Sequence, residues 1–279
     1  MQNIKSLLFV ILIKTSRLVD ILWTLYWSKS PITNKPLANK RIYYDLAKNT
    51  ANQKYIEIDA FEKKCGHALD IKWLDDLALH TQIVIKKSPL SYAHGRVLYS
   101  AIAHWLTINK YKYVNIVETG TARGFSSVCM AKALDDFGVS GSILTFDLLP
   151  SKDSIYWNCI DDNNSKSNRF DLLSNWRYLV DKYIIFIQGD TRVMLPRIGV
   201  GRVHLAYLDG SHKYEDVFFE FQQLYKFQNS GDMIIFDDYS ESKFPGLVRA
   251  VDEICSEFGY KKVVLAASND RGYVLATKH

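Results

Sequence analysis

The sequence predicts an α/β fold in which a mostly parallel sheet ends in a C-terminal antiparallel hairpin and follows an N-terminal helical cap. Beyond Lys110, continuous apolar runs alternate with segments of helical periodicity, which is the pattern of parallel strands covered by helices on both faces. The last two apolar runs, 261–266 and 273–277, are separated by a short polar turn. That spacing favours a hairpin at the end of the sheet.

The elements can be placed in order along the chain. Between residues 91 and 106, apolar side chains recur at helical spacing, and the preceding stretch from residue 41 also reads mainly as helix. Strands are expected at 113–117, 142–146, 183–187, 203–208 and 233–236, with a helix at 126–137 and a long polar and helical excursion at 148–181. The chain is therefore divided into a helix and linker (1–39), a helical cap (40–110) and a main domain (111–279).

Composition excludes several classes of function. The chain has 279 residues, and its net charge of +5 is spread without a block of like charges, so nucleic acid is not an expected partner. The four cysteines lie far apart and form no C-x-x-C pair, which argues against a disulfide framework and against a zinc site. A reducing cytoplasm fits this pattern.

The N-terminal segment 4–27 predicts an amphipathic helix. Its apolar run 7–13 is interrupted afterwards by Lys14, Arg17 and Asp20, and it is far shorter than the roughly 20 residues that a spanning helix needs. No small-x-small cleavage site follows, so a signal peptide is not expected. Two roles stay open: peripheral contact with the inner membrane surface, or packing against the main domain or a second subunit of a homo-oligomer.

The stretch 115–127, NIVETGTARGFSS, joins a short apolar strand to a helix through a glycine-containing loop. Such a loop lets the backbone approach a nucleotide cofactor. Ala122 stands where a dinucleotide fingerprint has its second glycine, so the pattern is E-x-G-x-x-x-G. The candidate cofactor-binding residues are Glu118, Gly120, Thr121, Ala122, Gly124 and Ser126. The loop resembles that of the class I methyltransferases, which implies a Rossmann-like fold and S-adenosylmethionine as the cofactor.

Two later strand ends carry further candidates for cofactor binding. Asp147 lies 23 residues after Gly124, close to the spacing of about 20 residues at which a carboxylate accepts hydrogen bonds from ribose hydroxyls. The next strand is followed by Gln188, Gly189, Asp190 and Thr191. In similar methyltransferases, an acidic side chain or its neighbours at this place recognise the adenine amino group. The alternative is that Asp190 caps a helix beginning near Thr191.

Three carboxylates follow the fourth and fifth strands. Asp209 ends the first of these, and Asp237 and Asp238 end the second. Carboxylates that converge from adjacent strand ends repel one another unless they are protonated or share a cation. An all-oxygen set suits Mg²⁺, Ca²⁺ or Mn²⁺ rather than zinc. The alternative is that Asp237 or Asp238 is a turn residue satisfied by local amides.

The segments DGSHKYEDV, GDMIIFDDY and FPGLVRAVDE resemble the methyltransferase group that includes macrolide-sugar O-methyltransferases and cephalosporin-hydroxylase-like proteins. The resemblance covers about 114–277. It implies that Asp209, Asp237 and Asp238 bind a magnesium ion that chelates substrate hydroxyls, and that His212 acts with Asp209 in catalysis as the general base. Some members have Glu where this chain has Asp237. Alternatively, His212 bonds across the turn or caps the next helix.

These interpretations together predict an S-adenosylmethionine-dependent O-methyltransferase, assisted by Mg²⁺, that acts on a hydroxyl of a sugar, glycan unit or other small molecule. Two alternatives remain. One is a non-catalytic, membrane-associated adaptor that keeps the fold, and the other is a metal-independent N-methyltransferase. The acceptor pocket is expected between the helical cap and the segment 148–181, neither of which carries a diagnostic motif.

Overall fold

The computed structural model describes residues 32–268 and 271–279. The amphipathic helix predicted at 4–27 lies outside these residues. No helix within the described ranges is long and apolar enough to cross a lipid bilayer.

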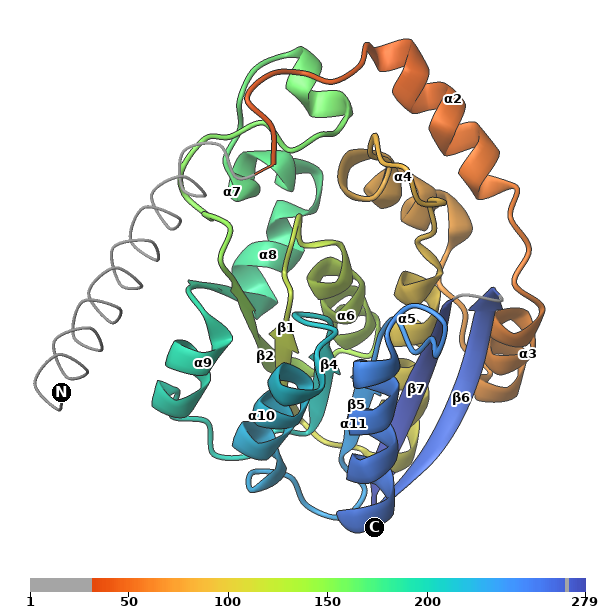
Figure 1. Ribbon diagram of the computed structural model, residues 1–279, viewed down its shortest axis with the longest axis vertical. Helices are drawn as coiled ribbons and strands as arrows, with labels where there is room; N and C mark the ends of the chain where they lie inside the picture. Colours follow the sequence, from red (N-terminus) through yellow and green to blue (C-terminus); the bar gives the residue numbers. More distant parts are fainter. Residues whose placement is uncertain (1–31, 269–270) are drawn as a thin grey trace, which may run out of the picture.

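The predicted fold class is confirmed. The described residues form a seven-stranded sheet with the order β3-β2-β1-β4-β5-β7-β6 (Figure 1). Strands β1 to β5 pair in parallel, whereas β7 runs antiparallel to both β5 and β6. The strands are β1 (Tyr113–Thr119), β2 (Ser140–Asp147), β3 (Ile184–Gln188), β4 (Leu205–Leu208), β5 (Met233–Phe236), β6 (Tyr260–Ser268) and β7 (Arg271–Lys278).

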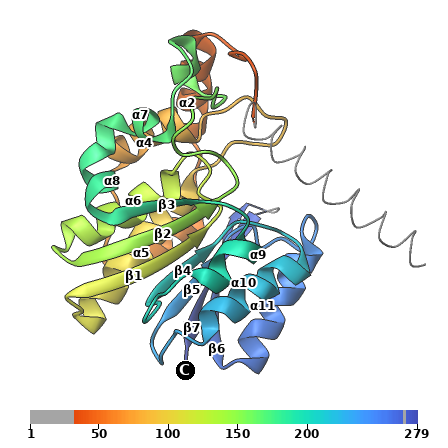
Figure 2. The same cartoon turned by 90° about the vertical axis from the view of Figure 1, so that its left-hand side faces the viewer.

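Helices cover both faces of the sheet (Figure 2). One face carries α5 (Ala93–Asn109), α6 (Phe125–Asp136) and α8 (Arg177–Tyr183), and the other carries α9 (Thr191–Met194), α10 (Tyr214–Tyr225) and α11 (Pro245–Glu257). Strand β5 is apolar throughout because both of its faces are buried. Met233 and Ile235 join the apolar cluster under α5 and α6, while Ile234 and Phe236 join the cluster under α10 and α11.

Residues 40–110 fold into α2 (Lys40–Ala51), α3 (Ile56–Cys65), α4 (Ile71–Thr81) and α5. Helix α5 packs along α6 and shares its apolar cluster, and α3 packs against α5 and β6. The division of the chain at residues 39 and 110 stays a prediction, because these helices share one apolar cluster with the sheet.

The excursion between β2 and β3 contains only short helices before α8: η1 (Ile160–Asn163), α7 (Arg169–Leu172) and η2 (Ser174–Trp176). They surround a small apolar cluster that includes the fully buried Trp157. A further short turn, η3 (Leu195–Arg197), follows α9.

The strand order places a switch point at the centre of the sheet. From β1 the chain moves outward through β2 to β3, and then crosses back to β4 and β5 on the other side of β1. In open α/β sheets, ligands bind beyond the carboxyl ends of the strands at such a point. The loops after β1, β4 and β5 therefore define the region in which a functional site is expected.

Candidate functional site

The loop after β1 has the backbone conformation that its glycines permit. Gly120 and Gly124 both have φ of +89°, and Ala122 also has a positive φ, of 45°. The amides of Gly120 and Thr121 donate to the carbonyl of Phe146 at 2.9 and 3.3 Å, so the loop is fixed to the end of β2. A Cβ atom at Gly120 would lie 2.4 Å from the carbonyl oxygen of Asp209. The glycine is therefore required for close approach of the loops after β1 and β4.

Replacing Gly120 with Ala is expected to cost at least about 2 kcal/mol of unfolding free energy, through backbone strain and overpacking. Gly66→Ala is the matched control, because Gly66 has φ of +75° but no atom within 4 Å of its built Cβ. Urea unfolding of both variants measures the difference. Equal costs for the two variants would show that contact with Asp209 adds nothing to the backbone strain.

Glu118 lies beneath the loop. Its side chain is fully buried and accepts hydrogen bonds from the hydroxyls of Ser126 and Ser127 in the first turn of α6. Burial raises the pKa of Glu118, and the two serine hydrogen bonds oppose this shift. The carboxylate thus holds the loop against the helix that follows it.

A cavity of about 260 Å³ opens beside the loop. Five of the eleven predicted cofactor-binding residues line it: Gly120, Asp147, Gly189, Asp190 and Thr191. The other six do not: Glu118, Thr121, Ala122, Gly124, Ser126 and Gln188. Gly210, which follows Asp209, also lines the cavity. The cavity therefore joins the ends of β1, β2, β3 and β4.

The two acidic residues of this cavity also hold its walls in place. Asp147 accepts from the amides of Ala122 and Leu149 at 2.6 and 2.7 Å, which ties it to the glycine-containing loop. Asp190 accepts from the amide of Arg192 at 2.8 Å and is the N-cap of α9. The capping role weighed for Asp190 in the sequence is therefore present, and the same residue lines the cavity.

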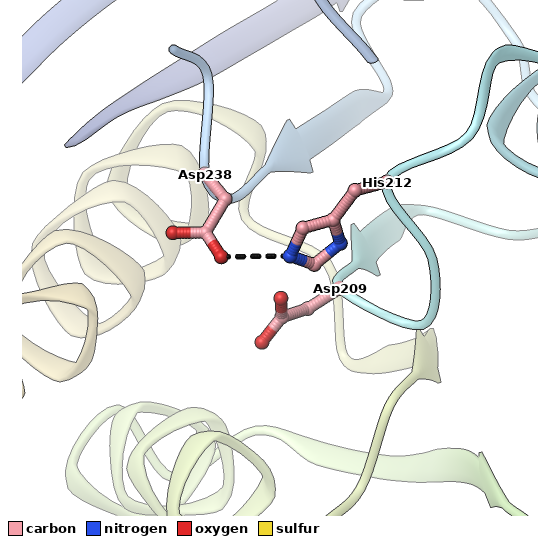
Figure 3. A group of neighbouring side chains, drawn as sticks. All are labelled: Asp209, His212 and Asp238. Atoms are coloured by element: carbon pink, nitrogen blue, oxygen red, sulfur yellow. Dashed lines mark hydrogen bonds and ion pairs between the residues drawn. The ribbon is translucent and has the colours of Figure 1, made fainter. Parts of the chain in front are cut away.

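A second group of side chains lies at the ends of β4 and β5. Asp209, His212 and Asp238 each offer one ligand atom within 4.8 Å of the others, and they point toward one another (Figure 3). The Nε2 atom of His212 is 2.9 Å from the Oδ2 atom of Asp238. Asp238 has φ of 55°, a left-handed conformation that is uncommon for residues other than glycine. The donor set could hold a metal ion through two carboxylates and one imidazole.

Asp237 is placed differently from its prediction as a metal ligand. It is fully buried, and the guanidinium of Arg271 donates to its two oxygens at 2.7 and 3.2 Å. Tyr207 donates to the same carboxylate at 2.6 Å. The ligand group found among the described residues thus contains His212 in place of Asp237, and it is not the all-oxygen set that was expected. Arg271, from the terminal hairpin, thus offsets the negative charge of Asp237, which we expected from the sequence to be offset by a metal cation.

Comparison with known proteins identifies the domain that carries these features. Residues 117–239 match a family model described as a methyltransferase domain. These residues form a methyltransferase domain.

Three individual proteins are similar to the chain. The O-methyltransferase NovP has 19% sequence identity over 68% of this chain and 81% of its own, with a TM-score of 0.51. The O-methyltransferase TomG of Streptomyces achromogenes, solved with S-adenosylmethionine, has 15% identity over 76% of this chain and 91% of its own, with a TM-score of 0.50. Both likenesses concern the fold. An uncharacterized protein, R132, of Acanthamoeba polyphaga mimivirus is 34% identical over 56 residues, which are 20% of this chain and only a quarter of that protein.

The acidic groups of the methyltransferase domain differ in their protonation. Burial and the neighbouring charge of Asp237 raise the pKa of both Asp209 and Asp238. Burial opposes ionisation of Asp237 as well, but the guanidinium of Arg271 lowers its pKa overall. The carboxyls of Asp209 and Asp238 therefore hold their protons more strongly than usual in the absence of a cation.

Glu220 is a cavity residue of the methyltransferase domain that we did not predict. It lies on α10, is 2% exposed, and accepts from the hydroxyls of Thr119 and Thr191 at 2.8 Å each. Burial raises its pKa to about 7, and the two threonine hydrogen bonds oppose this shift. A glutamate inside an amphipathic helix carries no sequence signal for this position, because only the fold turns it inward.

The raised pKa of Glu220 predicts a pH dependence of stability. Because the folded state keeps this proton up to about pH 7 while the unfolded state loses it near 4.5, unfolding free energy should fall as pH rises between these values. The fall should approach about 3 kcal/mol at most. Urea unfolding from pH 4.5 to 8 should show a larger fall in the wild type and in the exposed control Glu257→Gln than in Glu220→Gln, where other carboxyls with raised pKa, such as Glu118 and Asp209, still contribute. A fall of equal size in Glu220→Gln would assign it to another group.

Proposed function

We propose that this protein is an S-adenosylmethionine-dependent O-methyltransferase, assisted by magnesium, that acts on a hydroxyl of a sugar, glycan unit or other small molecule. The observation that carries this proposal is the adjacency of two features. Gly210 lines the cavity beside the glycine-containing loop, and its chain neighbour Asp209 belongs to the group with His212 and Asp238. A methyl donor and a polarised acceptor would thus meet at the end of β4.

The residues around the 260 Å³ cavity fit the cofactor. Gly120, Gly189 and Gly210 leave its walls without side chains, and a Cβ atom at Gly120 or Gly189 would lie within 2.7 Å of a neighbouring atom. Asp147 and Asp190 offer carboxylate oxygens to ribose hydroxyls and to an exocyclic amine. When bound, the cofactor supplies an already activated methyl group, so the protein mainly has to align the acceptor oxygen.

The residues at the ends of β4 and β5 fit a divalent cation. Asp209 and Asp238 would hold it, because a cation offsets the cost of ionising two neighbouring buried carboxyls. A bound ion of this kind lowers the pKa of an acceptor hydroxyl. His212 is then placed to accept the hydroxyl proton, while its hydrogen bond with Asp238 orients the ring.

A larger cavity, of about 650 Å³, is the candidate acceptor site. Its lining includes Asp238 and Arg271 together with residues 53–55, 86 and 88–91. The helical region 40–110 therefore contributes to this cavity as expected. None of its described lining residues comes from the segment 148–181, which was also expected to contribute.

Oxygen as the acceptor atom is supported by the naming of NovP and TomG as O-methyltransferases, although these likenesses show the fold alone. Transfer to nitrogen without a metal is the principal alternative. Membrane contact through residues 4–27, homo-oligomer formation and the adaptor role stay predictions.

The proposal is tested by methyl transfer to a panel of sugars and glycans, together with calorimetry of cofactor binding. Cofactor binding is expected in the wild type, in Asp209→Asn and in the control Asp181→Asn, whose side chain is exposed and pairs with Arg177. Turnover should be lost in EDTA, restored by Mg²⁺, and reduced about 100-fold or more in Asp209→Asn only. Absence of cofactor binding would favour the non-catalytic adaptor. A turnover rate that EDTA does not change would favour the metal-independent N-methyltransferase.

A further inference from the structure

The 650 Å³ cavity beside Asp238 carries more positive charge than a site for a neutral sugar requires. Lys54, from the connection between α2 and α3, and Lys86, from the segment before α5, both line it. Lys243 and Arg271 line it as well, and Asp238 is the single carboxylate among its described lining residues. These cations come from four separate parts of the chain, which the fold brings to one cavity.

Lys54 and Lys86 have no direct side-chain partner among the described residues, although Asp238 and Asp237 act on the charge of Lys86 from a distance. Neither side chain forms a salt bridge or a hydrogen bond among residues 32–268 and 271–279, although Arg271 pairs with Asp237 and Asp238. Burial and the nearby guanidinium of Arg271 lower the pKa of Lys86. An ammonium group beside another cation is stabilised by any anion that enters the cavity.

The neighbouring groups favour a phosphoryl group as that anion. Lysine binds phosphate as a point charge and provides up to three donors. Ser88 lines the same cavity as Lys86 and can add a hydroxyl donor. The cavity also ends at Asp238, so a phosphorylated ligand could place a hydroxyl near His212 while its phosphate lies toward the lysines.

We propose that the acceptor is a phosphorylated sugar whose phosphoryl group is bound by Lys54 and Lys86. This inference rests on the proposed function, because it names the substrate class of the same site. The phosphate can belong to a sugar monophosphate or to a nucleotide sugar, and both present the same chemistry to the lysines.

Calorimetry of the full chain tests the proposal with glucose 1-phosphate, UDP-glucose and glucose as probes. EDTA and saturating S-adenosylhomocysteine are present throughout, so that neither a metal ion nor the cofactor cavity binds the phosphate. Both phosphorylated probes should bind the wild type more tightly than glucose, and less tightly as salt is added. Lys54→Gln/Lys86→Gln should bind them at least about tenfold more weakly. Lys87→Gln is the matched control, because Lys87 is exposed and does not line the cavity.

The comparison among probes identifies the source of the phosphate. Tighter binding of UDP-glucose supports a nucleotide sugar, and equal or tighter binding of glucose 1-phosphate supports a monophosphate. The proposal is overturned if no phosphorylated probe binds the wild type, if glucose binds equally well, or if the double variant binds as the wild type does. S-adenosylhomocysteine binding is measured separately, so a failed cofactor site is distinguished from a failed phosphate site.

Discussion

His212→Gln is expected to lower the rate of methyl transfer by roughly 10² to 10⁴, the usual contribution of a general base. The residue is suited to this role because its Nε2 atom contacts Asp238 at 2.9 Å and its ring packs edge-on against Phe244, with the ring centroids 4.1 Å apart. Glutamine keeps polar atoms near Asp238 but cannot accept the proton at neutral pH. The loss should appear in kcat, while affinity for S-adenosylmethionine stays within about twofold of wild type.

A matched control for His212→Gln is available in the same chain. His80 also pairs with an aspartate, at 2.7 Å from Asp161, but it lies on α4 and does not belong to the group of Asp209, His212 and Asp238. His80→Gln should therefore retain wild-type turnover. If the rate of His212→Gln matches that of the wild type, His212 is not the base.

Arg271→Met is expected to destabilise the fold by about 3–5 kcal/mol, because it leaves Asp237 buried without its countercharge. Asp237 has no exposed surface, and Tyr207 would remain as its principal hydrogen-bond donor. Methionine preserves much of the volume of the arginine side chain, so the loss reports mainly on charge. Urea unfolding at neutral pH measures the change. Arg177→Met is the control, because Arg177 forms an exposed ion pair with Asp181.

The pH dependence of this loss has a defined sign. Arg271 lowers the pKa of Asp237 in the folded wild type, so its contribution is present above the ordinary aspartate pKa of 3.8 and is lost as pH falls through the lowered value. The difference between Arg271→Met and wild type should therefore narrow in acid. A second variant, Arg271→Met/Asp237→Asn, should regain part of the stability at neutral pH. Destabilisation that is constant with pH, and unchanged in the double variant, would argue against an electrostatic cause.

Much of the fold could be predicted because buried parallel strands are apolar throughout. The run 233–236 coincides with β5, and the predicted helix 126–137 differs from α6 (Phe125–Asp136) by one residue at each end. The terminal hairpin was found from its polar turn. Its position between β5 and the sheet edge could not be predicted, since long-range strand pairing leaves no local pattern.

The candidate site was predictable where residues follow strands directly. Asp209 and Asp238 are close together because adjacent parallel strands end at one edge of the sheet. The role of Asp237 could not be read in the same way, because its partner Arg271 comes from a distant hairpin. For the 650 Å³ cavity, the contribution of the helical region 40–110 was expected, but its individual lining residues could not be predicted, because they depend on how residues 53–55, 86 and 88–91 pack near the sheet ends.

The position of Arg271 has a consequence for synthesis of the protein. Strand β7 is last in chain order but inserts between β5 and β6, and its first residue neutralises Asp237. During translation, every other strand of the sheet emerges before this one. Asp237 therefore lacks its arginine partner until β7 has been made and paired. A nascent chain stalled before residue 271 would contain the loop after β1 and both acidic strand ends, yet the buried carboxylate of Asp237 would have no countercharge.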